Sequence, residues 1–369
     1  MIIAINCRHL SSIKLEGFGT YTHEIVKRWI ENHPEVNFIL IFDREPTVQF
    51  PTLSNVQKII CAPPTRHPLL YWIWFELMIP SILKKTKADL FFSPDGYNSL
   101  RSSTPSITTV HDLNFEHNPK DIPRFLSAYL RYFFPRFTKK ASGVLTVSNY
   151  SKLDIQHTYK IPESQIKVIY NGASDAYKPL DLAIQNEIRK KITGGRPYFI
   201  YVGSLHPRKN LQRLVNAYQK IGGAAADLVI VGSRMWRNHS LKIDAKNEKN
   251  IHFLGYVNQT ELAGIMGSAM ALTYVPYFEG FGIPMVEAMR CGTPIIAAKT
   301  TCLPEIASDA AIYCDPFDEQ DIQDKMLELM GNPSLQAELS RKALARGKQF
   351  SWDLCATETW TAIQTIANI

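Results

Sequence analysis

The sequence lacks the short motifs that mark several common enzyme classes. It has no Asp-x-Asp pair, which disfavours the metal-dependent, single-domain design of nucleotide-sugar enzymes. It has no G-x-x-x-x-G-K-[ST] stretch, which excludes a P-loop phosphotransferase. It also has no G-x-S-x-G elbow, which weighs against an α/β-hydrolase.

Paired cysteines and long apolar runs are missing too. The six cysteines form no C-x-x-C pair, and this scattering fits a reducing cytosol. The N-terminal MIIAINC has no basic leader region, so we expect a first strand there and no signal peptide. The longest apolar run, Leu69 to Pro80, is interrupted by Glu76 and is too short for a membrane span. These features predict a cytoplasmic protein and leave open a place at the inner face of the cell membrane.

Size and composition indicate a folded protein of two domains. A chain of 369 residues exceeds what one core usually organises, and its 45% hydrophobic and 20% charged residues are typical of soluble folded proteins. The net charge of +7 is mildly basic. That charge is compatible with anionic substrates, anionic lipid or nucleic acid and does not choose between them.

β-rich runs alternate with helix-length segments along the chain. The predicted strands are Ile2–Asn6, Phe38–Phe42, Val56–Cys61, Leu90–Ser93, Ile107–Val110, Val144–Val147, Ile166–Tyr170, Tyr198–Val202, Leu228–Val231, Ile251–Leu254, Ala271–Val275, Pro294–Ala297 and Ala311–Cys314. The predicted helices are Thr20–Asn32, Leu69–Lys85, Pro123–Lys140, Tyr150–Tyr159, Asn210–Ile221, Gln259–Gly267, Ile283–Arg290 and Asp318–Met330. Such alternation predicts mainly parallel sheets with helices on both faces.

A stretch rich in turn formers, residues 171–181, divides the chain into two such arrays. We therefore expect an α/β protein with two tandem Rossmann-like, doubly wound parallel sheets facing across a cleft. The predicted boundaries are an N-terminal domain over 1–173, a linker over 174–181 and a C-terminal domain over 182–350. The segment 351–369 either completes the second domain or crosses back to the first.

The stretch EGFGIPMVE, from Glu279 to Glu287, is the strongest candidate for a binding site. Glycines at 280 and 282 let the backbone approach a ligand, and Pro284 sits where a helix would begin. A helix N-terminus suits phosphate, and each carboxylate can accept hydrogen bonds from hydroxyl groups. The alternative is a helix cap with two solvated glutamates, and the stretch alone does not decide between them.

A second candidate is VGSLHPRKN at 202–210. A buried strand stops at Gly203, Arg208 and Lys209 follow on a loop, and Asn210 is placed to cap the next helix. Adjacent cations at the carboxyl edge of a sheet suit a diphosphate, with arginine as a bidentate fork and lysine as a point charge. An exposed basic turn is the alternative.

Two further candidates follow strands of the first half. His111 emerges beside Asp112 at the end of a predicted strand, where it is either catalytic or structural. The stretch EGFGT at 16–20 reads as a glycine-bearing loop that opens a helix and can approach phosphate. Because position 22 is threonine, the stretch is not a full G-x-G-x-x-G, and a dinucleotide site is weakly supported.

Two aromatic and basic segments raise the question of a membrane surface. They are YWIWF at 71–75, with lysines behind it, and RYFFPRF at 131–137, with Lys139 and Lys140 after it. Aromatic side chains beside lysines suit a lipid interface. We favour two core helices with solvated basic ends over that reading. No signature of a nucleic-acid-binding module accompanies the segments, so no nucleic-acid partner is expected.

Taken together, these motifs resemble glycosyltransferase family 4, also called group 1. The most specific part runs from Glu279 to Asp318 and is similar to the family's E-x7-E signature. VGSLHPRKN, VHDLN, VSNYSK and VIYNG also match in order and spacing, so the resemblance covers essentially the whole chain. GFGTY at 17–21 resembles the start of a bacterial subgroup rich in mannosyltransferases, although Thr20 stands where many relatives have arginine.

The resemblance implies the glycosyltransferase B fold, with an N-terminal acceptor-side domain and a C-terminal nucleotide-sugar-binding domain, and a role for each matching residue. Arg208 and Lys209 would bind the donor diphosphate and assist its departure. Glu287 would hold the ribose hydroxyls, Glu279 would lie close to the donor sugar, and His111 would contact that sugar near the reacting carbon. The further donor-binding residues it implies are Gly17, Phe18, Gly19, Gly203, Ser204, Tyr256, Val257, Gly280, Phe281 and Gly282.

The resemblance also implies a retaining, metal-independent reaction without a cofactor. Because both glutamates already have binding roles, front-face substitution is preferred to a carboxylate nucleophile. We expect transfer of a hexose, with mannose favoured, from GDP-mannose or else a UDP- or dTDP-sugar. The expected acceptor is a surface polysaccharide, an O-antigen or a lipid-linked oligosaccharide. The alternatives are a nucleotide-sugar epimerase or phosphorylase of the same architecture, or a non-catalytic nucleotide-sugar binder.

Overall fold

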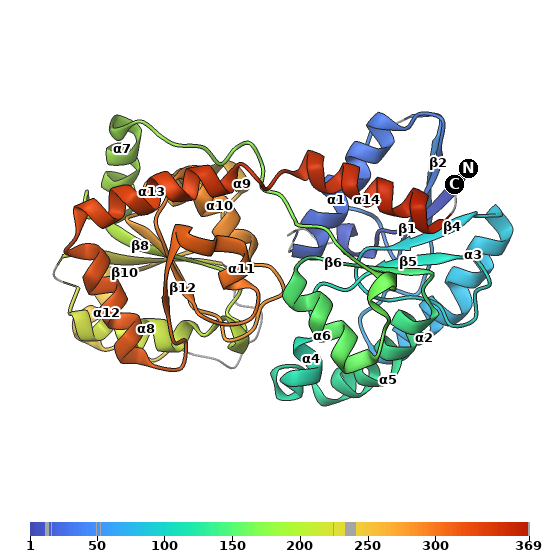
Figure 1. The fold of residues 1–369 in the computed structure, drawn as a ribbon, viewed down its shortest axis with the longest axis horizontal. Coiled ribbons are helices and arrows are strands. Elements are labelled where there is room, and N and C mark those ends of the chain that lie inside the picture. Colours follow the sequence, from blue (N-terminus) through green and yellow to red (C-terminus); the bar gives the residue numbers. More distant parts are fainter. Residues whose placement is uncertain are drawn as a thin grey trace. The chain divides into compact units, whose positions relative to one another are not determined.

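The computed structural model describes residues 1–11, 15, 17–48, 50–51, 53–223, 225–232 and 241–367 (Figure 1). The chain divides into two compact units. Unit 1 comprises Met1–Asn171 together with Trp352–Ile369, and unit 2 comprises Gly172–Ser351. Each unit has a parallel sheet of its own.

In unit 1, the strands of the described residues form one sheet in the order β3-β2-β1-β4-β5-β6-β7, and all neighbouring strands are parallel. The order reverses between β1 and β4, and such a reversal is where doubly wound sheets bind ligands. The strands are β1 (Ile2–Asn6), β2 (Asn37–Phe42), β3 (Val56–Ile60), β4 (Leu90–Ser93), β5 (Ser106–Thr109), β6 (Gly143–Thr146) and β7 (Ile166–Val168).

Helices cover both faces of this sheet. Because successive side chains of a strand point to opposite faces, Ile3 and Ile5 enter one core, beside Trp29 of α1, while Ala4 enters the other, beside Phe134 of α5. The helices are α1 (Gly17–Asn32), α2 (Pro68–Ile73), α3 (Ile79–Thr86), α4 (Asn114–His117), α5 (Arg124–Lys140), α6 (Asn149–Tyr159) and α14 (Trp352–Ala367).

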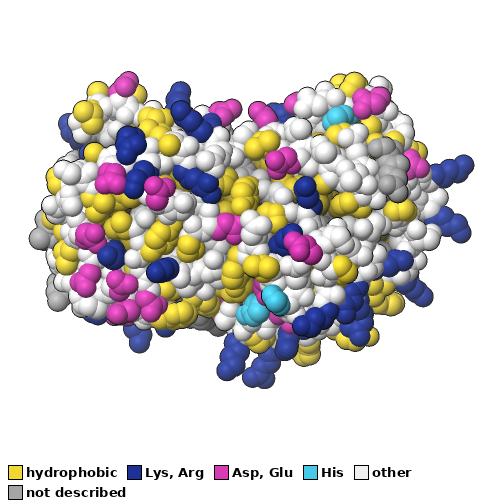
Figure 2. Space-filling view, in the orientation of Figure 1, with side chains coloured by type: hydrophobic (Ala, Val, Ile, Leu, Met, Phe, Trp, Pro, Cys, Tyr) yellow, Lys and Arg dark blue, Asp and Glu magenta, His cyan; other side chains and the backbone are white. Residues whose placement is uncertain are grey.

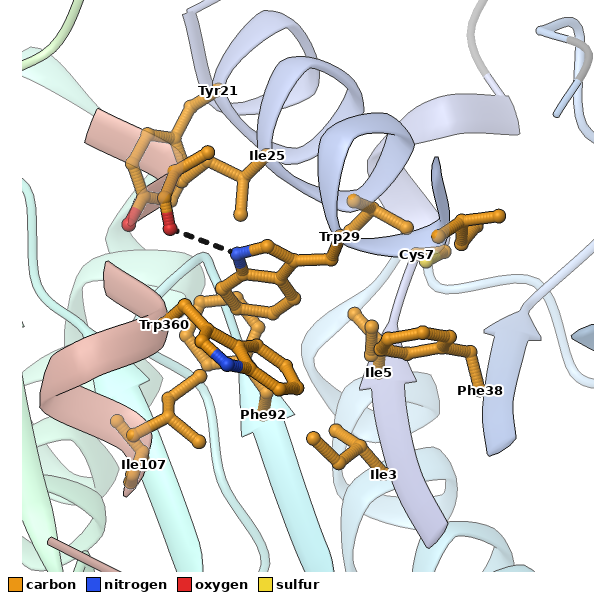
Figure 3. Packing of buried hydrophobic residues seen from close by; sticks show 14 of the residues in the cluster. Ile3, Ile5, Cys7, Tyr21, Ile25, Trp29, Phe38, Phe92, Ile107 and Trp360 are labelled. Atoms are coloured by element: carbon orange, nitrogen blue, oxygen red, sulfur yellow. Dashed lines mark hydrogen bonds between the residues drawn. The ribbon is translucent and has the colours of Figure 1, made fainter. Parts of the chain in front are cut away.

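The C-terminal helix α14 packs against α1 in unit 1 (Figure 3). The rings of Trp29 and Trp360 lie 5.5 Å apart between centroids, and His33 stacks on Trp360 at 3.9 Å. Trp29 Nε1 donates a hydrogen bond of 3.0 Å to the carbonyl oxygen of Ala356. The last segment of the chain therefore contributes to the core formed with the first helix.

In unit 2, the strands of the described residues form a second parallel sheet in the order β10-β9-β8-β11-β12-β13, which reverses between β8 and β11. The strands are β8 (Tyr198–Val202), β9 (Asp227–Val231), β10 (Ile251–Gly255), β11 (Ala271–Tyr274), β12 (Ile295–Ala298) and β13 (Ala311–Cys314). The helices are α7 (Leu182–Thr193), α8 (Leu211–Ile221), α9 (Gln259–Gly267), α10 (Ile283–Cys291), α11 (Leu303–Ala307), α12 (Glu319–Met330) and α13 (Pro333–Gly347).

The prediction of two doubly wound parallel sheets is confirmed, and each predicted strand is present with its ends within two residues. The continuous helix predicted over Leu69–Lys85 is wrong in its middle, because Trp74–Met78 forms a π-helical turn between α2 and α3. The buried Glu76 in that turn accepts hydrogen bonds from the backbone nitrogens of Leu100 and Arg101, each at 3.1 Å. This contact joins the turn to the loop after β4.

Removing the Trp360 indole is expected to destabilise unit 1. The side chain is only 6% exposed, and truncating a core tryptophan typically lowers the free energy of unfolding by about 3–5 kcal/mol. Guanidinium denaturation of Trp360→Ala, followed by circular dichroism, measures the loss. Glu358→Ala, at an exposed position of the same helix, is the matched control. Equal midpoints for the two variants would show that the contact between α1 and α14 adds no stability.

Candidate active site

The loop after β8 carries Arg208 and Lys209 at the carboxyl edge of the unit 2 sheet. Pro207–Lys209 form a single 3-10 turn, preceded by His206, whose Nδ1 lies 3.3 Å from the backbone nitrogen of Arg208 and caps the turn. The Arg208 carbonyl oxygen accepts a 3.0 Å hydrogen bond from the backbone nitrogen of Tyr277, in the loop after β11. The two loops that meet at the strand-order reversal are thus joined through their backbones.

Asn210 holds the same pair of loops together. The residue precedes α8 with φ +59°, but its side chain makes no capping hydrogen bond, so the predicted cap is wrong. The side-chain amide instead donates to the carbonyl oxygens of Val275, at 2.9 Å, and Pro316, at 2.6 Å. The side-chain oxygen that a cap would use accepts a 2.8 Å hydrogen bond from Arg213 Nη1 instead, which accounts for the different role.

Glu279 follows β11, the neighbour of β8, and its carboxylate meets both cations. Arg208 Nη1 lies 3.1 Å from Oε1 of Glu279, and Lys209 Nζ forms an ion pair with the same oxygen. Lys209 also donates a 2.9 Å hydrogen bond to the hydroxyl of Tyr274. The side chain of Glu279 is 7% exposed, whereas those of Arg208 and Lys209 are 23% and 13% exposed. Both cations are therefore more exposed than the carboxylate that they contact.

The charges at this point do not cancel. Burial by itself would raise the pKa of the Glu279 carboxyl, but Arg208 and Lys209 beside it hold that pKa below its ordinary value. The carboxylate is consequently ionised at neutral pH, and the three side chains carry one net positive charge. A positive, partly exposed group at the carboxyl edge of a doubly wound sheet is suited to phosphate.

Glu287 lies on α10 and has a different environment. Its carboxyl is hydrogen-bonded to the buried Tyr177, and burial raises its pKa to about 7. The preceding loop turns sharply at Gly282, where φ is +91° and an added Cβ would lie 3.0 Å from side-chain atoms of Leu303 and Met285. Glycine is therefore required there. Phe281 is 4% exposed, so the loop presents backbone rather than this ring.

The other unit 2 candidates lie at the same edge of the sheet. Gly203 and Ser204 directly follow β8, and the carbonyl oxygen of Ser204 accepts a 3.0 Å hydrogen bond from the Tyr201 hydroxyl. Tyr256, which is 52% exposed, and Val257 follow β10, the border strand. Within the described ranges, no group of three or more histidine, cysteine, aspartate or glutamate side chains is placed to hold a metal ion.

The remaining candidates belong to unit 1. His111 follows β5, and its Nε2 donates a 2.8 Å hydrogen bond to the carbonyl oxygen of Pro94, while burial lowers the pKa of the imidazole. The prediction that Gly17, Phe18 and Gly19 lie in a loop is wrong. They make the first turn of α1, because the helix starts three residues earlier than predicted. Glu16 lies outside the described residues.

A buried polar cluster at the reversal in unit 1 was missed from the sequence. Arg8 and His9 follow β1, Asp95 follows the adjacent β4, and both basic side chains contact the Asp95 carboxylate. The feature of the sequence that could have indicated this cluster is the position of charged residues just after two strands. It becomes interpretable only when the strand order is known.

Comparison with solved structures establishes the fold. The chain has the fold of a sucrose-phosphate synthase from Thermosynechococcus elongatus, with a TM-score of 0.79 and 17% identity, covering 99% of this chain and 98% of that one. It also matches HepE from Anabaena, solved in complex with UDP-glucose, with a TM-score of 0.77 and 16% identity, covering 99% and 100%. The fold is the glycosyltransferase B fold.

Comparison of sequences establishes the family. Residues 15–177 match the model for Glycosyltransferase Family 4, and residues 183–346 match that for Glycosyl transferases group 1. The O-antigen chain mannosyltransferase B of Escherichia coli is 29% identical, with 95% of this chain and 97% of the relative covered. The O-antigen chain mannosyltransferase RfbU of Salmonella typhimurium is 31% identical, with 74% of each covered. The chain belongs to glycosyltransferase family 4, whose members are retaining hexosyltransferases, and the resemblance seen in its motifs is confirmed.

The raised pKa of Glu287 predicts a dependence of stability on pH. In the folded state the carboxyl keeps its proton up to about pH 7, whereas the unfolded chain loses it near 4.5. Because the folded state binds more protons in this interval, the free energy of unfolding should fall as pH rises through it. Denaturation series between these pH values measure the slope for wild type and Glu287→Gln.

The glutamine variant should lose this contribution to the slope, and Glu187→Gln, at an exposed position of α7, should keep it. A slope unchanged by Glu287→Gln would show that the carboxyl titrates normally.

Proposed function

We propose that the protein transfers mannose, with retention of configuration and without a metal ion, from GDP-mannose to a growing O-antigen, surface polysaccharide or lipid-linked oligosaccharide. The observation that carries the reaction type is the ion cluster of Arg208, Lys209 and Glu279 at the strand-order reversal of unit 2. The preference for mannose comes from the two O-antigen chain mannosyltransferases that the chain resembles over most of its length. Family membership favours transfer over the epimerase, phosphorylase and non-catalytic alternatives.

Arg208 and Lys209 are proposed to bind the donor diphosphate. When the bond between the sugar C1 and the phosphate oxygen breaks, negative charge develops on the leaving phosphate, and two fixed cations stabilise it. The acceptor oxygen forms its bond to C1 on the same face, and its proton passes to the departing phosphate oxygen. Glu279 is ionised, so it cannot supply that proton. Its proposed task is to hold both cations and to accept a hydrogen bond from the donor sugar.

The other proposed donor contacts divide between nucleotide and sugar. Glu287 would bind the ribose hydroxyls, and the backbone of Gly280, Phe281 and Gly282 would approach the sugar and phosphates at the start of α10. Gly203 and Ser204 would line the diphosphate, and Tyr256 and Val257 the base. His111, in unit 1, is proposed to contact the transferred sugar.

A donor screen with product analysis tests this function. The protein is incubated with GDP-mannose, UDP-glucose, UDP-N-acetylglucosamine and dTDP-rhamnose, and the product anomer is determined by NMR. Turnover of GDP-mannose to an α-linked product supports the proposal. Turnover of another donor alone would show that mannose is not the transferred sugar. A product with inverted anomeric configuration would exclude front-face substitution. No binding of any donor would contradict the proposed function.

The two cations are expected to be needed for catalysis rather than for folding. Arg208→Ala and Lys209→Ala should each lower kcat by about 100-fold or more, because each removes charge stabilisation of the leaving group. Each variant leaves one cation beside Glu279, so circular dichroism should show a folded protein. Lys190→Ala, at an exposed position of α7, is the control. Rates near wild type would remove these residues from the leaving-group role.

A peripheral contact with membrane is proposed for unit 1. In the described part of the chain, no helix is both long enough and apolar enough to cross a membrane. In the second aromatic segment Phe134 and Phe137 are buried, as in the favoured core reading, whereas Tyr132 is 54% exposed. Phe125, earlier on the same helix, is 81% exposed. Lysine and arginine side chains gather over α4 and α5 along the lower margin of unit 1 (Figure 2). Exposed rings among cations suit an anionic lipid surface.

Binding to anionic vesicles should therefore depend on salt and on the end of α5. Co-sedimentation with phosphatidylglycerol vesicles should fall as ionic strength rises, because screening weakens the attraction. The double variant Lys139→Glu/Lys140→Glu should bind less than wild type. The same reversal at Lys190 and Lys191, two exposed positions of α7, is the control. No sedimentation at low salt would leave α5 as a core helix with solvated basic residues.

A further inference from the structure

The cluster at the strand-order reversal of unit 1 is centred on Asp95, whose side chain is 1% exposed. Its Oδ2 accepts a 2.6 Å hydrogen bond from Arg8 Nε, and its Oδ1 accepts hydrogen bonds from Asn6 Nδ2, at 2.9 Å, and Ser93 Oγ, at 3.1 Å. The partners come from both strands that flank the reversal. The carboxylate is therefore fixed in position, and its charge is balanced by Arg8.

His9 reaches this carboxylate from the exposed side. Its Nε2 is buried and lies 3.0 Å from Oδ2 of Asp95, although the ring is not aligned for a linear hydrogen bond. A carboxylate can only accept, so the hydrogen of the neutral imidazole belongs on Nε2 and the lone pair on Nδ1. The side chain keeps 32% of its surface exposed. Because Nε2 is buried, Nδ1 is the ring nitrogen on the exposed side.

Phe18 stands between two imidazoles. Its ring centroid lies 5.6 Å from that of His9 and 4.8 Å from that of His111, and the residue is 42% exposed. Because the Nε2 of His111 donates to the carbonyl oxygen of Pro94, its Nδ1 also carries a lone pair. An exposed apolar ring flanked by two hydrogen-bond acceptors matches a sugar, which offers C–H faces and hydroxyl donors.

The cluster differs in charge from the site of unit 2. Burial and the nearby Arg8 hold the pKa of His9 below its ordinary value, and burial does the same for His111. Both imidazoles are thus neutral at pH 7, and Arg8 is neutralised by Asp95. Arg8, Asp95, His9 and His111 together thus carry no net charge, and their surface offers hydrogen bonds beside an apolar ring. It suits a neutral sugar better than a diphosphate.

We propose that His9 and Phe18 bind the acceptor sugar, with His9 Nδ1 accepting a hydrogen bond from an acceptor hydroxyl and the Phe18 ring packing on the sugar's C–H face. Arg8 and Asp95 act through His9 as positioning residues. The inference rests on the proposed function, because that function assigns the donor diphosphate to unit 2. Phe18, for which the family resemblance implies a donor contact, is here assigned to the acceptor.

The test separates acceptor binding from donor binding in the full-length protein. Methyl α-D-mannopyranoside is the acceptor probe, and GDP release from GDP-mannose is measured with and without it. His9→Ala and Phe18→Ala should each raise the KM of the probe by about tenfold, the effect of one lost contact. GDP affinity and GDP-mannose hydrolysis without acceptor should stay within about twofold of wild type.

Three variants sharpen the comparison. His9→Asn keeps an acceptor atom near the position of Nδ1 and should recover part of the affinity for the probe. His157→Ala, at an exposed position of α6, and Phe253→Ala, which removes a ring that is 44% exposed in unit 2, should leave all three quantities unchanged.

An unchanged KM for the probe in His9→Ala and Phe18→Ala would overturn the inference. So would a parallel loss of GDP affinity or of donor hydrolysis, which would place both residues at the donor. If wild type hydrolyses no nucleotide sugar, the proposed function fails, and saturation-transfer NMR then decides for this site. A saturation-transfer signal on methyl α-D-mannopyranoside that is abolished in His9→Ala supports the inference. The absence of that signal with the wild-type protein overturns it.

Discussion

A buried carboxylate shared by two cations is the interaction on which the site of unit 2 depends. Removing a carboxylate from water costs several kcal/mol unless charged partners and hydrogen bonds replace the solvent, and Glu279 has both Arg208 and Lys209. These partners lie on a different loop. The loops after β8 and β11 must therefore keep a fixed position relative to each other, and the hydrogen bond from the Asn210 side chain to Val275 holds them together. Local backbone contacts and the ion cluster impose the same geometry.

Unit 1 repeats this arrangement with a different balance of charge. In each unit, a buried acid follows the strand on one side of the reversal, and a basic side chain follows the strand on the other side. Among the described residues, Asp95 forms an ion pair with Arg8 and has neutral His9 beside it, whereas Glu279 contacts two cations. The surplus cation makes the unit 2 site attractive to an anion, and the balanced pair makes the unit 1 site a neutral one. One topology can thus support two kinds of substrate contact.

Much of the fold was predictable because the information is local. Most strands of the two sheets, though not the border strand β3, are buried apolar runs separated by turn formers, and β8 was predicted from Tyr198 to Val202 with both ends correct. Helices with little buried surface were missed. In α7 only Thr193 is buried among its residues, so the helix shows no clear apolar stripe. The π-helical turn around Glu76 was also missed, because its backbone partners at 100 and 101 lie more than twenty residues away.

The sequence by itself determined the family, the two parallel sheets and the chemical character of Arg208, Lys209, Glu279 and Glu287, because motif order, apolar periodicity and residue type are properties of the chain. Only the tertiary structure decided which of these side chains contact one another. It placed both cations on Glu279 and left Glu287 with Tyr177. It also brought Arg8 and His9 to Asp95. The physical reason is that strand order, which no local pattern encodes, sets which loops meet at the edge of a sheet.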